Sequence, residues 1–514
     1  MKNLSDLVKD LPGLVSITGE DIPILGIAFD SRKVNPGDVF VAFKGLSLDG
    51  HKYIPDAIQA GAIAAVGTQQ LELDIPYVCV ADSRSALAYI SAAFYDYPAK
   101  KLTVIGITGT DGKTTTSNLL FSILKAAGKK VGMISTVNAV IGNDIVDTGF
   151  HVTTPDAPDL QMYLSKMVKA GLTHVILETT SHSLEQKRVE ACEFDVAVVT
   201  NITHEHLDAH GGSLDRYRTA KARLFSSLAA TGIKQQGNPR MGVTNKDDWS
   251  YEFLQDFITG PQVCYGLTPD ADIYARNICI DETGIHFTAC GGTFEVEVSS
   301  KLVGLYNVSN ILAAMAAAIS GLDVRPRIAA QGIYAMSGIP GRMEFIDSGQ
   351  DFTAIVDFAH TPNALFKTLQ TARQITRKRV IAVFGSAGLR DREKRRMMSE
   401  ISAEFADLTI LTAEDPRTES LEDILDEMAD GVESRGGVRN ETFWCVPDRG
   451  EAIRFALKKA QKDDLVIVCG KGHEQSMCFG SKEYSWDDRV AMKAALAEYL
   501  EVNGPDMPYL PTQD

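Results

Sequence analysis

The residues best suited to chemistry follow the apolar run 102–105 and read Gly-Ile-Thr-Gly-Thr-Asp-Gly-Lys-Thr-Thr-Thr at 106–116. This order predicts a strand, a glycine loop and the first turn of a helix. The backbone N–H groups of such a loop point at one place, where the helix dipole also favours negative charge. Lys113 would reach the β- and γ-phosphates of a nucleotide, and the Thr114 hydroxyl would bind Mg²⁺.

This loop departs from the standard phosphate-loop pattern, because Ile107 stands where the first glycine would be. The alternative is a plain strand–turn–helix with a lone lysine. The sequence disfavours it, because a run of hydroxyl side chains after Gly-Lys has no use in packing.

Two other segments carry side chains that suit a metal near this loop. Glu178 ends the apolar run 174–177, and a carboxylate at the carboxyl end of a strand is a suitable Mg²⁺ ligand, although alone it would be interpreted as a solvated acid. Segment 203–210 reads Thr-His-Glu-His-Leu-Asp-Ala-His, close to the metal-binding pattern of metallo-β-lactamase-like hydrolases. Nothing else supports a dinuclear zinc enzyme. A second metal ligand at the nucleotide site is therefore favoured, over that class and over a helix start with exposed histidines.

Charged residues follow three apolar runs in the last third of the chain. The loops 385–391, 414–417 and 470–474 come directly after or close behind the runs 380–384, 408–412 and 465–469. Ligands of open α/β sheets bind beyond the carboxyl ends of the strands. Any one of these loops could be an ordinary connection, but together their acidic and basic groups suit a zwitterionic ligand.

The elements that position these residues alternate along almost the whole chain. Short β-branched runs are separated by amphipathic stretches, which predicts the α/β fold class with parallel sheets. A length of 514 residues is enough for about three domains. We place them at 1–100, 101–342 and 343–514, and we expect the proline-containing tail 503–514 to be loose.

Composition narrows the class of protein. A formal net charge of −16 argues against a nucleic-acid partner. The eight cysteines lack zinc or redox spacing, which indicates reduced thiols in a cytosol. No signal peptide and no long apolar run is evident, so we expect a cytoplasmic protein without membrane insertion.

Motifs spread over nearly the whole chain make it similar to the Mur ligases, the ATP-dependent ligases of peptidoglycan synthesis. The segments that carry the resemblance are 30–32, 36–42, 49–51, 109–115, 153–155, 178–188, 200–221, 307–310, 340–344 and 357–362. The likeness is greatest to the members that add the third amino acid to UDP-MurNAc-L-Ala-D-Glu. It implies three domains: an N-terminal UDP-sugar-binding α/β domain, a central P-loop-type mononucleotide-binding domain with a parallel sheet, and a C-terminal Rossmann-like α/β domain.

The resemblance also implies roles for individual residues. ATP and its phosphates would be held by Gly109, Thr110, Asp111, Gly112, Lys113, Thr114, Thr115, Asn307, Arg342, Asp357 and His360. The UDP-muramoyl-dipeptide would be held by Phe29, Ser31, Thr153, Thr154, Thr180, Gln186 and Arg188. The incoming amino acid would be held by Arg390, Glu414, Asp415, Pro416, Arg417, Gly470 and Glu474. Mg²⁺ would be held by Thr114, Glu178, His206 and Lys221, with Lys221 N-carboxylated, and the catalytic residues would be Lys113, Glu178, His206 and Lys221.

Some residues depart from the family pattern. Glu205, Ala209 and Thr180 stand where Asp, Tyr and Ser are usual. Segment 414–417 reads Glu-Asp-Pro-Arg instead of the Asp-Asn-Pro-Arg of members that add diaminopimelate.

This last departure bears on the choice of amino acid. Arg417 can bind a distal carboxylate, which meso-diaminopimelate has and lysine lacks. Asp415 would favour a plain ammonium, as in lysine or ornithine, unless the two residues pair with each other. The sequence favours meso-diaminopimelate. It also leaves open a sister ligase that adds a dipeptide, a folylpolyglutamate synthase and an inactive nucleotide-binding scaffold.

Overall fold

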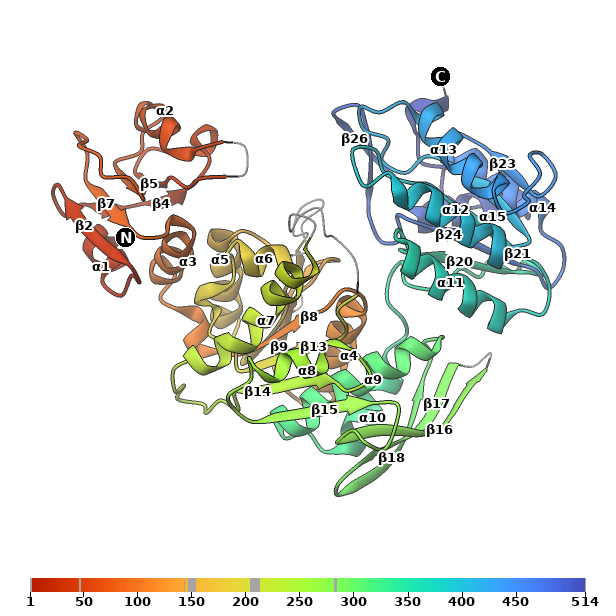
Figure 1. Cartoon of the computed structure of the whole chain (residues 1–514), viewed down its shortest axis with the longest axis horizontal. Coiled ribbons are helices and arrows are strands. Elements are labelled where there is room, and N and C mark those ends of the chain that lie inside the picture. The colour runs from red at the N-terminus through yellow and green to blue at the C-terminus, as the bar shows by residue number, and fades with distance from the viewer. Residues whose placement is uncertain are drawn as a thin grey trace. The chain divides into compact units, whose positions relative to one another are not determined.

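The computed structural model describes residues 2–45, 48–142, 144–146, 154–203, 213–281 and 284–513. The chain packs into two compact units (Figure 1). The first comprises Met1–Tyr274, Gly291–Phe294 and Asn310–Gly332, and the second comprises Ala275–Cys290, Glu295–Ser309 and Ile333–Asp514. Among the described residues, none of the helices has both the length and the apolar character needed to cross a bilayer.

A five-stranded sheet forms the N-terminal part of the first unit. Its order is β2 (Leu14–Thr18), β7 (Tyr77–Val80), β6 (Ala64–Gly67), β5 (Asp38–Val41) and β4 (Gly26–Ala28), and only β2 is antiparallel to its neighbour. The inner strands are buried on both faces, as their apolar runs predict.

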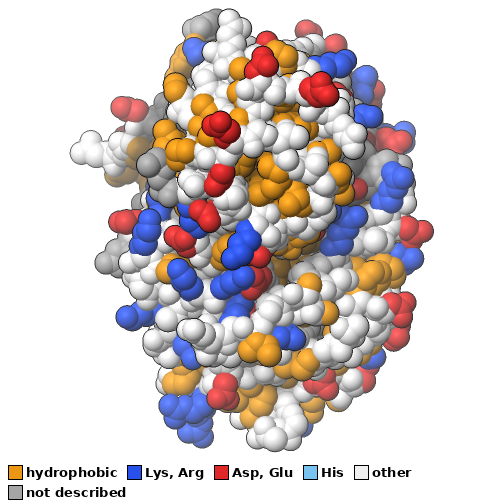
Figure 2. Space-filling view, turned by 90° about the vertical axis from the view of Figure 1, so that its left-hand side faces the viewer, with side chains coloured by type: hydrophobic (Ala, Val, Ile, Leu, Met, Phe, Trp, Pro, Cys, Tyr) orange, Lys and Arg blue, Asp and Glu red, His pale blue; other side chains and the backbone are white. Residues whose placement is uncertain are grey.

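Short helices and one small ribbon complete this part. The helices are α1 (Leu4–Val8), η1 (Ser31–Lys33), η2 (Gly50–Tyr53), α2 (Ile54–Gln59), α3 (Ser83–Phe94) and η3 (Pro98–Lys101), and β1 (Lys2–Asn3) pairs with β3 (Pro23–Ile24). The edge strand β2 exposes Leu14, Val15 and Ile17. Hydrophobic side chains gather in the upper part of the face shown in Figure 2.

An eleven-stranded sheet carries the phosphate loop. Its order is β11 (Asp144–Val146), β10 (Ala139–Ile141), β9 (Val131–Ile134), β12 (His174–Glu178), β8 (Thr103–Thr108), β13 (Val196–Val199), β14 (Met241–Asn245), β15 (Gln262–Gly266), β16 (Ile273–Asp281), β17 (Gly284–Gly291) and β18 (Phe294–Ser300). In this order, the strands that run from β9 through β12, β8, β13, β14 and β15 to β16 are parallel. In this register Glu178 lies opposite Ile107, so the carboxyl ends of β8 and β12 meet at one edge.

Helices connect the strands of this sheet or follow its last strand, β18. They are α4 (Lys113–Ala126), α5 (Ala157–Lys169), α6 (Ser181–Glu185), η4 (Glu190–Cys192), α7 (Leu214–Ala230), α8 (Ser250–Gln255), α9 (Leu305–Ala316), the π-helix η6 (Ala317–Gly321) and α10 (Pro326–Ala335). Leu164 of α5 and Phe225 of α7 pack with Val104 and Val175 of the sheet in one apolar core. That packing fixes the positions from which the loops at the sheet edge emerge.

A six-stranded sheet forms the centre of the second unit. Its order is β19 (Glu344–Phe345), β20 (Thr353–Asp357), β24 (Leu465–Cys469), β21 (Val380–Phe384), β22 (Leu408–Leu411) and β23 (Phe443–Cys445), and only β19 is antiparallel. One face packs against α11 (Pro362–Ile375), α12 (Glu393–Phe405) and α13 (Leu421–Glu433). The other packs against α14 (Arg449–Lys459) and α15 (Asp488–Tyr499). The sheet is therefore doubly wound.

The chain ends in a hairpin, helix α15 and a tail. The hairpin joins β25 (Ser476–Phe479) to β26 (Lys482–Ser485), and η7 (Pro511–Gln513) lies near the end. The prediction of a loose tail is wrong. Leu510 is fully buried in the apolar core beneath α14 and α15, and the Thr512 hydroxyl donates a hydrogen bond to Asp448 at 2.7 Å. The α/β class with parallel sheets is confirmed.

Candidate active site

The loop between β8 and α4 has a backbone that only glycine adopts easily. Gly109 has φ +151° and Gly112 has φ +82°, both in the region that L side chains rarely enter. A Cβ atom at Gly109 would overlap Thr200 Oγ1, and one at Gly112 would overlap Asn310 Oδ1. The two glycines are therefore required by conformation and by space.

Residues that follow β13 hold this loop in place. The N–H of Thr110 donates to the Asn201 carbonyl at 2.8 Å, and the N–H of Asp111 donates to Asn201 Oδ1 at 2.9 Å. The Thr200 hydroxyl donates to the Asp111 carbonyl at 2.5 Å. The sequence alone gave Thr200 and Asn201 no role in shaping the loop. Their position directly after a buried strand of the same sheet is the signal that could have found them.

Two lysines converge on the loop from different helices. Lys113 Nζ, at the start of α4, donates to the carbonyls of Gly109 at 3.0 Å and Thr110 at 2.8 Å. Lys221 lies on α7, is buried, and donates to the same Gly109 carbonyl at 2.7 Å. Its ammonium also lies over the Tyr217 ring, 4.6 Å from the centroid. Lys221 is therefore not the surface lysine that a helix of this composition would suggest.

Glu178 is fully buried at the end of β12. Its Oε2 accepts hydrogen bonds from the hydroxyls of Thr114 at 3.1 Å and Thr136 at 2.9 Å. A carboxylate with hydroxyl oxygens beside a phosphate loop is the oxygen donor set that Mg²⁺ prefers, so Thr114 and Glu178 fit a magnesium site. Thr136, which follows the neighbouring strand β9, was missed from the sequence.

Not every predicted metal ligand can be placed. His206 lies outside the described residues, as do Glu205, Ala209 and Thr153. In the ranges that are described, no three His, Cys, Asp or Glu side chains gather as a metal cluster. The placed oxygen donors are thus Thr114 and Glu178.

Four residues predicted to hold the muramoyl substrate form one group near Glu178. Thr154 Oγ1 donates to the Glu178 carbonyl at 2.8 Å, and the N–H of Thr180 donates to Thr154 Oγ1 at 3.4 Å. Arg188 donates to the Thr154 carbonyl at 3.0 Å and to Gln186 Oε1 at 2.8 and 3.0 Å. The structure therefore brings Thr154, Thr180, Gln186 and Arg188 together.

Phe29 and Ser31 belong to the N-terminal sheet region. The Phe29 ring stacks on Phe43 with centroids 6.2 Å apart, and Ser31 begins η1. None of the hydrogen bonds among the described residues joins either residue to the group around Thr154. Their place in one substrate site stays a prediction.

The second unit holds the residues predicted to bind adenosine. Asp357 accepts hydrogen bonds from the N–H groups of Met343 at 2.7 Å and Ala359 at 2.9 Å and from the Thr368 hydroxyl at 3.0 Å. This carboxylate orders the loops on either side of it. Asn307, on α9, donates to the Val303 carbonyl at 2.7 Å.

Arg342 lies against a cluster of three aromatic rings, and the sequence alone pointed to only one of them, His360. The guanidinium lies over the Phe358 ring at 4.3 Å, and that ring packs against His360 at 4.4 Å and His473 at 4.7 Å. Burial, helped by the charge of Arg342, lowers the pKa of His473 to about 3, so this histidine is neutral. The cluster thus combines a guanidinium with aromatic rings that are tilted against one another, and its Phe358 comes one residue after Asp357.

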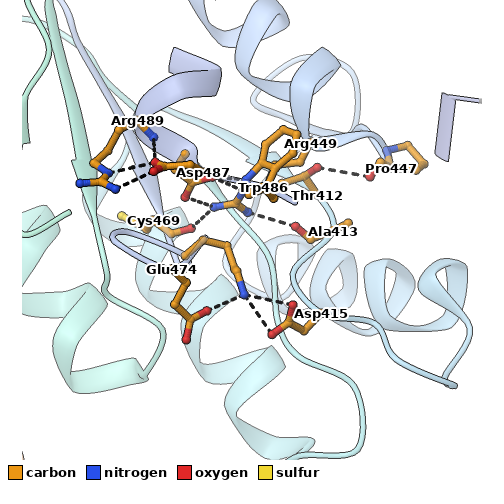
Figure 3. Close-up of polar contacts among 12 residues, drawn as sticks. Thr412, Ala413, Asp415, Pro447, Arg449, Cys469, Glu474, Trp486, Asp487 and Arg489 are labelled. Atoms are coloured by element: carbon orange, nitrogen blue, oxygen red, sulfur yellow. Dashed lines mark hydrogen bonds and ion pairs between the residues drawn. The ribbon is translucent and has the colours of Figure 1, made fainter. Parts of the chain in front are cut away.

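The residues predicted to bind the amino acid lie beyond β21, β22 and β24. Asp415 accepts hydrogen bonds from Lys471 Nζ at 3.0 and 3.1 Å (Figure 3). It also accepts one from the Cys478 N–H at 2.9 Å. Lys471 also contacts Glu474 at 2.5 Å. Pro416 is buried between Asp415 and Arg417, and both of these neighbours have positive φ, +41° and +55°. The sequence alone left Lys471 without a role.

Glu414 extends from β22 toward β24. Its side chain is buried, and a Cβ at Gly470, which has φ +118°, would overlap Glu414 Oε2. Burial raises the pKa of Glu414 to about 7, although Lys394, Arg449 and Lys471 act in the opposite direction.

Arg449 ties the carboxyl ends of two strands together, and it was missed from the sequence. Its guanidinium is fully buried and donates to the carbonyls of Ala413 at 3.0 Å and Cys469 at 2.8 Å and to both oxygens of Asp488 at 2.7 Å (Figure 3). Trp486 donates to the same carboxylate at 2.8 Å. No local motif marks this residue, because all its partners are distant in sequence.

Comparison with known proteins identifies the family. Three family models match the chain: the Mur ligase family, catalytic domain at 23–98, the Mur ligase middle domain at 107–318, and the Mur ligase, glutamate ligase domain at 341–472. The UDP-N-acetylmuramoyl-L-alanyl-D-glutamate--2,6-diaminopimelate ligase of Geobacillus thermodenitrificans is 39% identical over 498 residues, which cover 96% of this chain and 99% of that protein. The chain belongs to the Mur ligase family. It is thus an ATP-dependent ligase that forms amide bonds, with the three-domain architecture of that family.

Other relatives of this Mur ligase agree. The UDP-N-acetylmuramyl-tripeptide synthetase of a Roseiflexus species is 40% identical over 508 residues, covering 96% of this chain and 99% of that protein. A solved UDP-N-acetylmuramoyl-L-alanyl-D-glutamate--2,6-diaminopimelate ligase superposes with a TM-score of 0.67 at 28% identity, covering 97% and 99% of the two chains. A folylpolyglutamate synthase of Mycobacterium tuberculosis, with a TM-score of 0.61 at 14% identity over 80% of this chain and 94% of its own, shares the fold alone.

Proposed function

We propose that this Mur ligase joins meso-diaminopimelate to UDP-MurNAc-L-Ala-D-Glu at the expense of ATP, the reaction for which its 39% identical relative is named. The choice of amino acid rests on which arginines around loop 414–417 already have a carboxylate partner. Arg392 and Arg395 pair with Glu427, and Arg395 also pairs with Glu419. These guanidinium groups are already neutralised.

Arg417 and Arg390 differ from them. In the part of the chain that the structure describes, neither has a carboxylate within ion-pair distance. Among the described residues, the Arg417 guanidinium donates one hydrogen bond, to the Gly388 carbonyl at 3.4 Å, and Arg390 is exposed. A planar guanidinium binds a carboxylate through two parallel hydrogen bonds. Two such groups suit a ligand with a distal carboxylate, which diaminopimelate has and lysine and ornithine lack.

The ion pair between Asp415 and Lys471 removes the reason to expect lysine as the substrate. The sequence left open that Asp415 selects an ammonium or pairs with Arg417. Its carboxylate is instead bound by Lys471, which cancels its charge inside the protein. This supports diaminopimelate and leaves Glu414, Pro416, Gly470 and Glu474 to line the same crevice.

The first step of the reaction transfers a phosphoryl group from one anion, ATP, to another, the substrate carboxylate. The substrate carboxylate attacks the γ-phosphorus of ATP and displaces ADP to give an acyl phosphate. The amine of diaminopimelate then attacks the carbonyl carbon, displaces phosphate and loses a proton to give the amide. Lys113 would neutralise the approaching charges, with the loop 109–115 around the phosphates. Mg²⁺, held by Thr114 and Glu178, would supply further positive charge there. Lys221 and His206 are the other proposed ligands, and N-carboxylation would give Lys221 the negative charge this role needs.

The remaining assignments belong to the same proposal. Phe29, Ser31, Thr153, Thr154, Thr180, Gln186 and Arg188 would hold the UDP-muramoyl-dipeptide, and Asn307, Arg342, Asp357 and His360 would hold adenosine and phosphates. Arg188 already lies against Asp156 at 3.1 Å, so it would exchange an internal partner for the substrate. Because ATP and a UDP-sugar are cytosolic metabolites, we place the protein in the cytoplasm.

The test is phosphate release by the purified protein with ATP, Mg²⁺ and UDP-MurNAc-L-Ala-D-Glu. Diaminopimelate, lysine and ornithine are added in separate reactions. Release with diaminopimelate alone supports the proposal. Release with lysine or ornithine instead refutes the argument from Arg417. If no phosphate is released with any of the three amino acids, but phosphate is released with D-Ala-D-Ala and the UDP-muramoyl-tripeptide, the protein is the sister ligase that adds a dipeptide.

A further inference from the structure

Lys471 is a fully buried cation between two carboxylates of the amino-acid crevice. Its ammonium contacts both oxygens of Asp415 at 3.0 and 3.1 Å and Glu474 Oε2 at 2.5 Å (Figure 3). Asp415 follows β22, whereas Lys471 and Glu474 follow β24. The lysine therefore links two loops that the proposed function assigns to the amino acid, yet it is not itself one of the assigned binding residues.

The charges of this cluster are well defined. Burial alone would lower the pKa of Lys471, but Glu474 and Asp415 together raise it above its ordinary value, so the ammonium keeps its proton. Two other buried cations of this region already have carboxylate partners: Arg449 is bound to Asp488, and Arg395 is bound to Glu419 and Glu427. Lys471 thus opposes two carboxylates, and the cluster of Asp415, Lys471 and Glu474 retains one negative charge.

We propose that Lys471 is a positioning residue that sets the amino-acid preference. It neutralises the charge of Asp415, so that this aspartate acts as a neutral side chain would. Arg417 is then left to select a distal carboxylate. This inference rests on the proposed function. It follows from the contacts because an Asp415 without Lys471 would add an uncompensated negative charge to the crevice. Such a charge attracts a side chain that ends in an ammonium alone and repels a carboxylate.

The experiment measures kcat and KM for diaminopimelate and for lysine in three variants. In Lys471→Met, the ratio of kcat/KM for diaminopimelate to that for lysine should fall by about tenfold or more, mainly through KM. In Asp415→Asn the ratio should rise, because Lys471 then neutralises Glu474, the cluster carries no net charge, and the ammonium of the substrate lysine is no longer attracted to it. In the double variant the cluster again carries the single charge of Glu474, so the ratio should return toward the wild-type value.

The change of preference separates this inference from a merely structural role. If Lys471 only held the loops together, Lys471→Met would lower kcat/KM for both amino acids alike and leave their ratio unchanged. That outcome, or a double variant whose ratio stays as low as in Lys471→Met, overturns the inference. Should Lys471→Met fail to fold, Asp415→Asn decides, because an unchanged or lower ratio there contradicts the charge argument.

A matched control is available in the first unit. Lys234 and Asp195 form another fully buried lysine–aspartate pair, at 2.6 Å, and Lys234 also donates to backbone carbonyls of Leu102 and Glu193. Lys234→Met should lower the melting temperature and leave the diaminopimelate-to-lysine ratio unchanged. If the wild-type protein uses neither amino acid, the proposed function itself fails. If it uses diaminopimelate and Lys471→Met does not shift the ratio, only this inference fails.

Discussion

The buried Glu414 should make the stability of the second unit depend on pH. Glu414→Gln removes the ionisable group and keeps nearly the same shape. Burial raises the pKa of Glu414 from an ordinary 4.5 to about 7, because the charged form is poorly solvated beside Gly470. The folded state therefore holds this proton more tightly than the unfolded state does.

The sign and size of the effect follow from linkage. Below about pH 4.5 the carboxyl is protonated in both states and contributes nothing. As pH rises toward 7, the unfolded state ionises first, so the free energy of unfolding decreases, by about 3 kcal/mol in total. Since the sequence pI is near 5.2, solubility favours measurement from pH 6.0 to 8.5, and this window contains about 1.4 kcal/mol of the effect.

Urea unfolding, followed by the fluorescence of Trp444 and Trp486 in this unit, measures the effect. Between pH 6.0 and 8.5 the wild-type protein should lose about 1.4 kcal/mol relative to Glu414→Gln. Glu441→Gln, at an exposed position of the same unit, controls for the change of net charge and should track the wild type. A constant difference between wild type and Glu414→Gln across this range, or one of opposite sign, would show that the carboxyl is not held protonated by burial.

Three further substitutions test the site. Lys113→Ala should lower the rate of phosphate release by about a hundredfold or more, because a charge at the phosphates is lost, while circular dichroism stays unchanged; turnover close to the wild-type rate would remove Lys113 from the chemistry. Gly109→Ala should destabilise the protein by about 1–3 kcal/mol and raise KM for ATP, because Gly109 has a positive φ and an added Cβ would overlap Thr200. A melting temperature and a KM equal to those of the wild type would contradict this loop geometry. Arg417→Lys keeps the charge but loses the paired hydrogen bonds, so KM for diaminopimelate should rise about tenfold with a smaller change in kcat, and an unaltered KM would argue that Arg417 does not bind the distal carboxylate.

Much of the site could be predicted because its signals are local. The phosphate loop, its lysine and its hydroxyl residues lie within a few consecutive positions, and phosphate recognition uses backbone N–H groups that any such strand–loop–helix presents. The alternation of apolar runs with helical stretches likewise indicated parallel sheets, and with them the carboxyl edge where Glu178 and loop 414–417 would lie. The family resemblance then supplied roles that no local pattern carries, such as that of Lys221.

The tail was predicted wrongly because its anchor is a contact with residues distant in the sequence, which no local pattern marks. Its prolines and polar residues describe a segment without helix or strand, which is correct for most of it. Burial of one side chain, Leu510, is enough to anchor it, and no periodicity marks a single apolar residue that fills a gap in a distant core.

By itself, then, the sequence determined the class of fold, and it predicted a phosphate-binding role for loop 109–115 and the loops proposed to bind the amino acid, because each depends on residues close together in the chain. Only the tertiary structure decided the partners. Lys221 reaches the Gly109 carbonyl across 112 positions, and Lys471 reaches Asp415 across 56. Lys471 meets Asp415 because parallel strands bring their carboxyl ends to one edge of the sheet, and Lys221 meets the loop because α7 packs against the sheet that carries it. In both places a buried charge must find an opposite charge or a hydrogen-bond acceptor. The physical demand to neutralise a buried Asp415 turned a residue that suggested lysine into one that supports diaminopimelate.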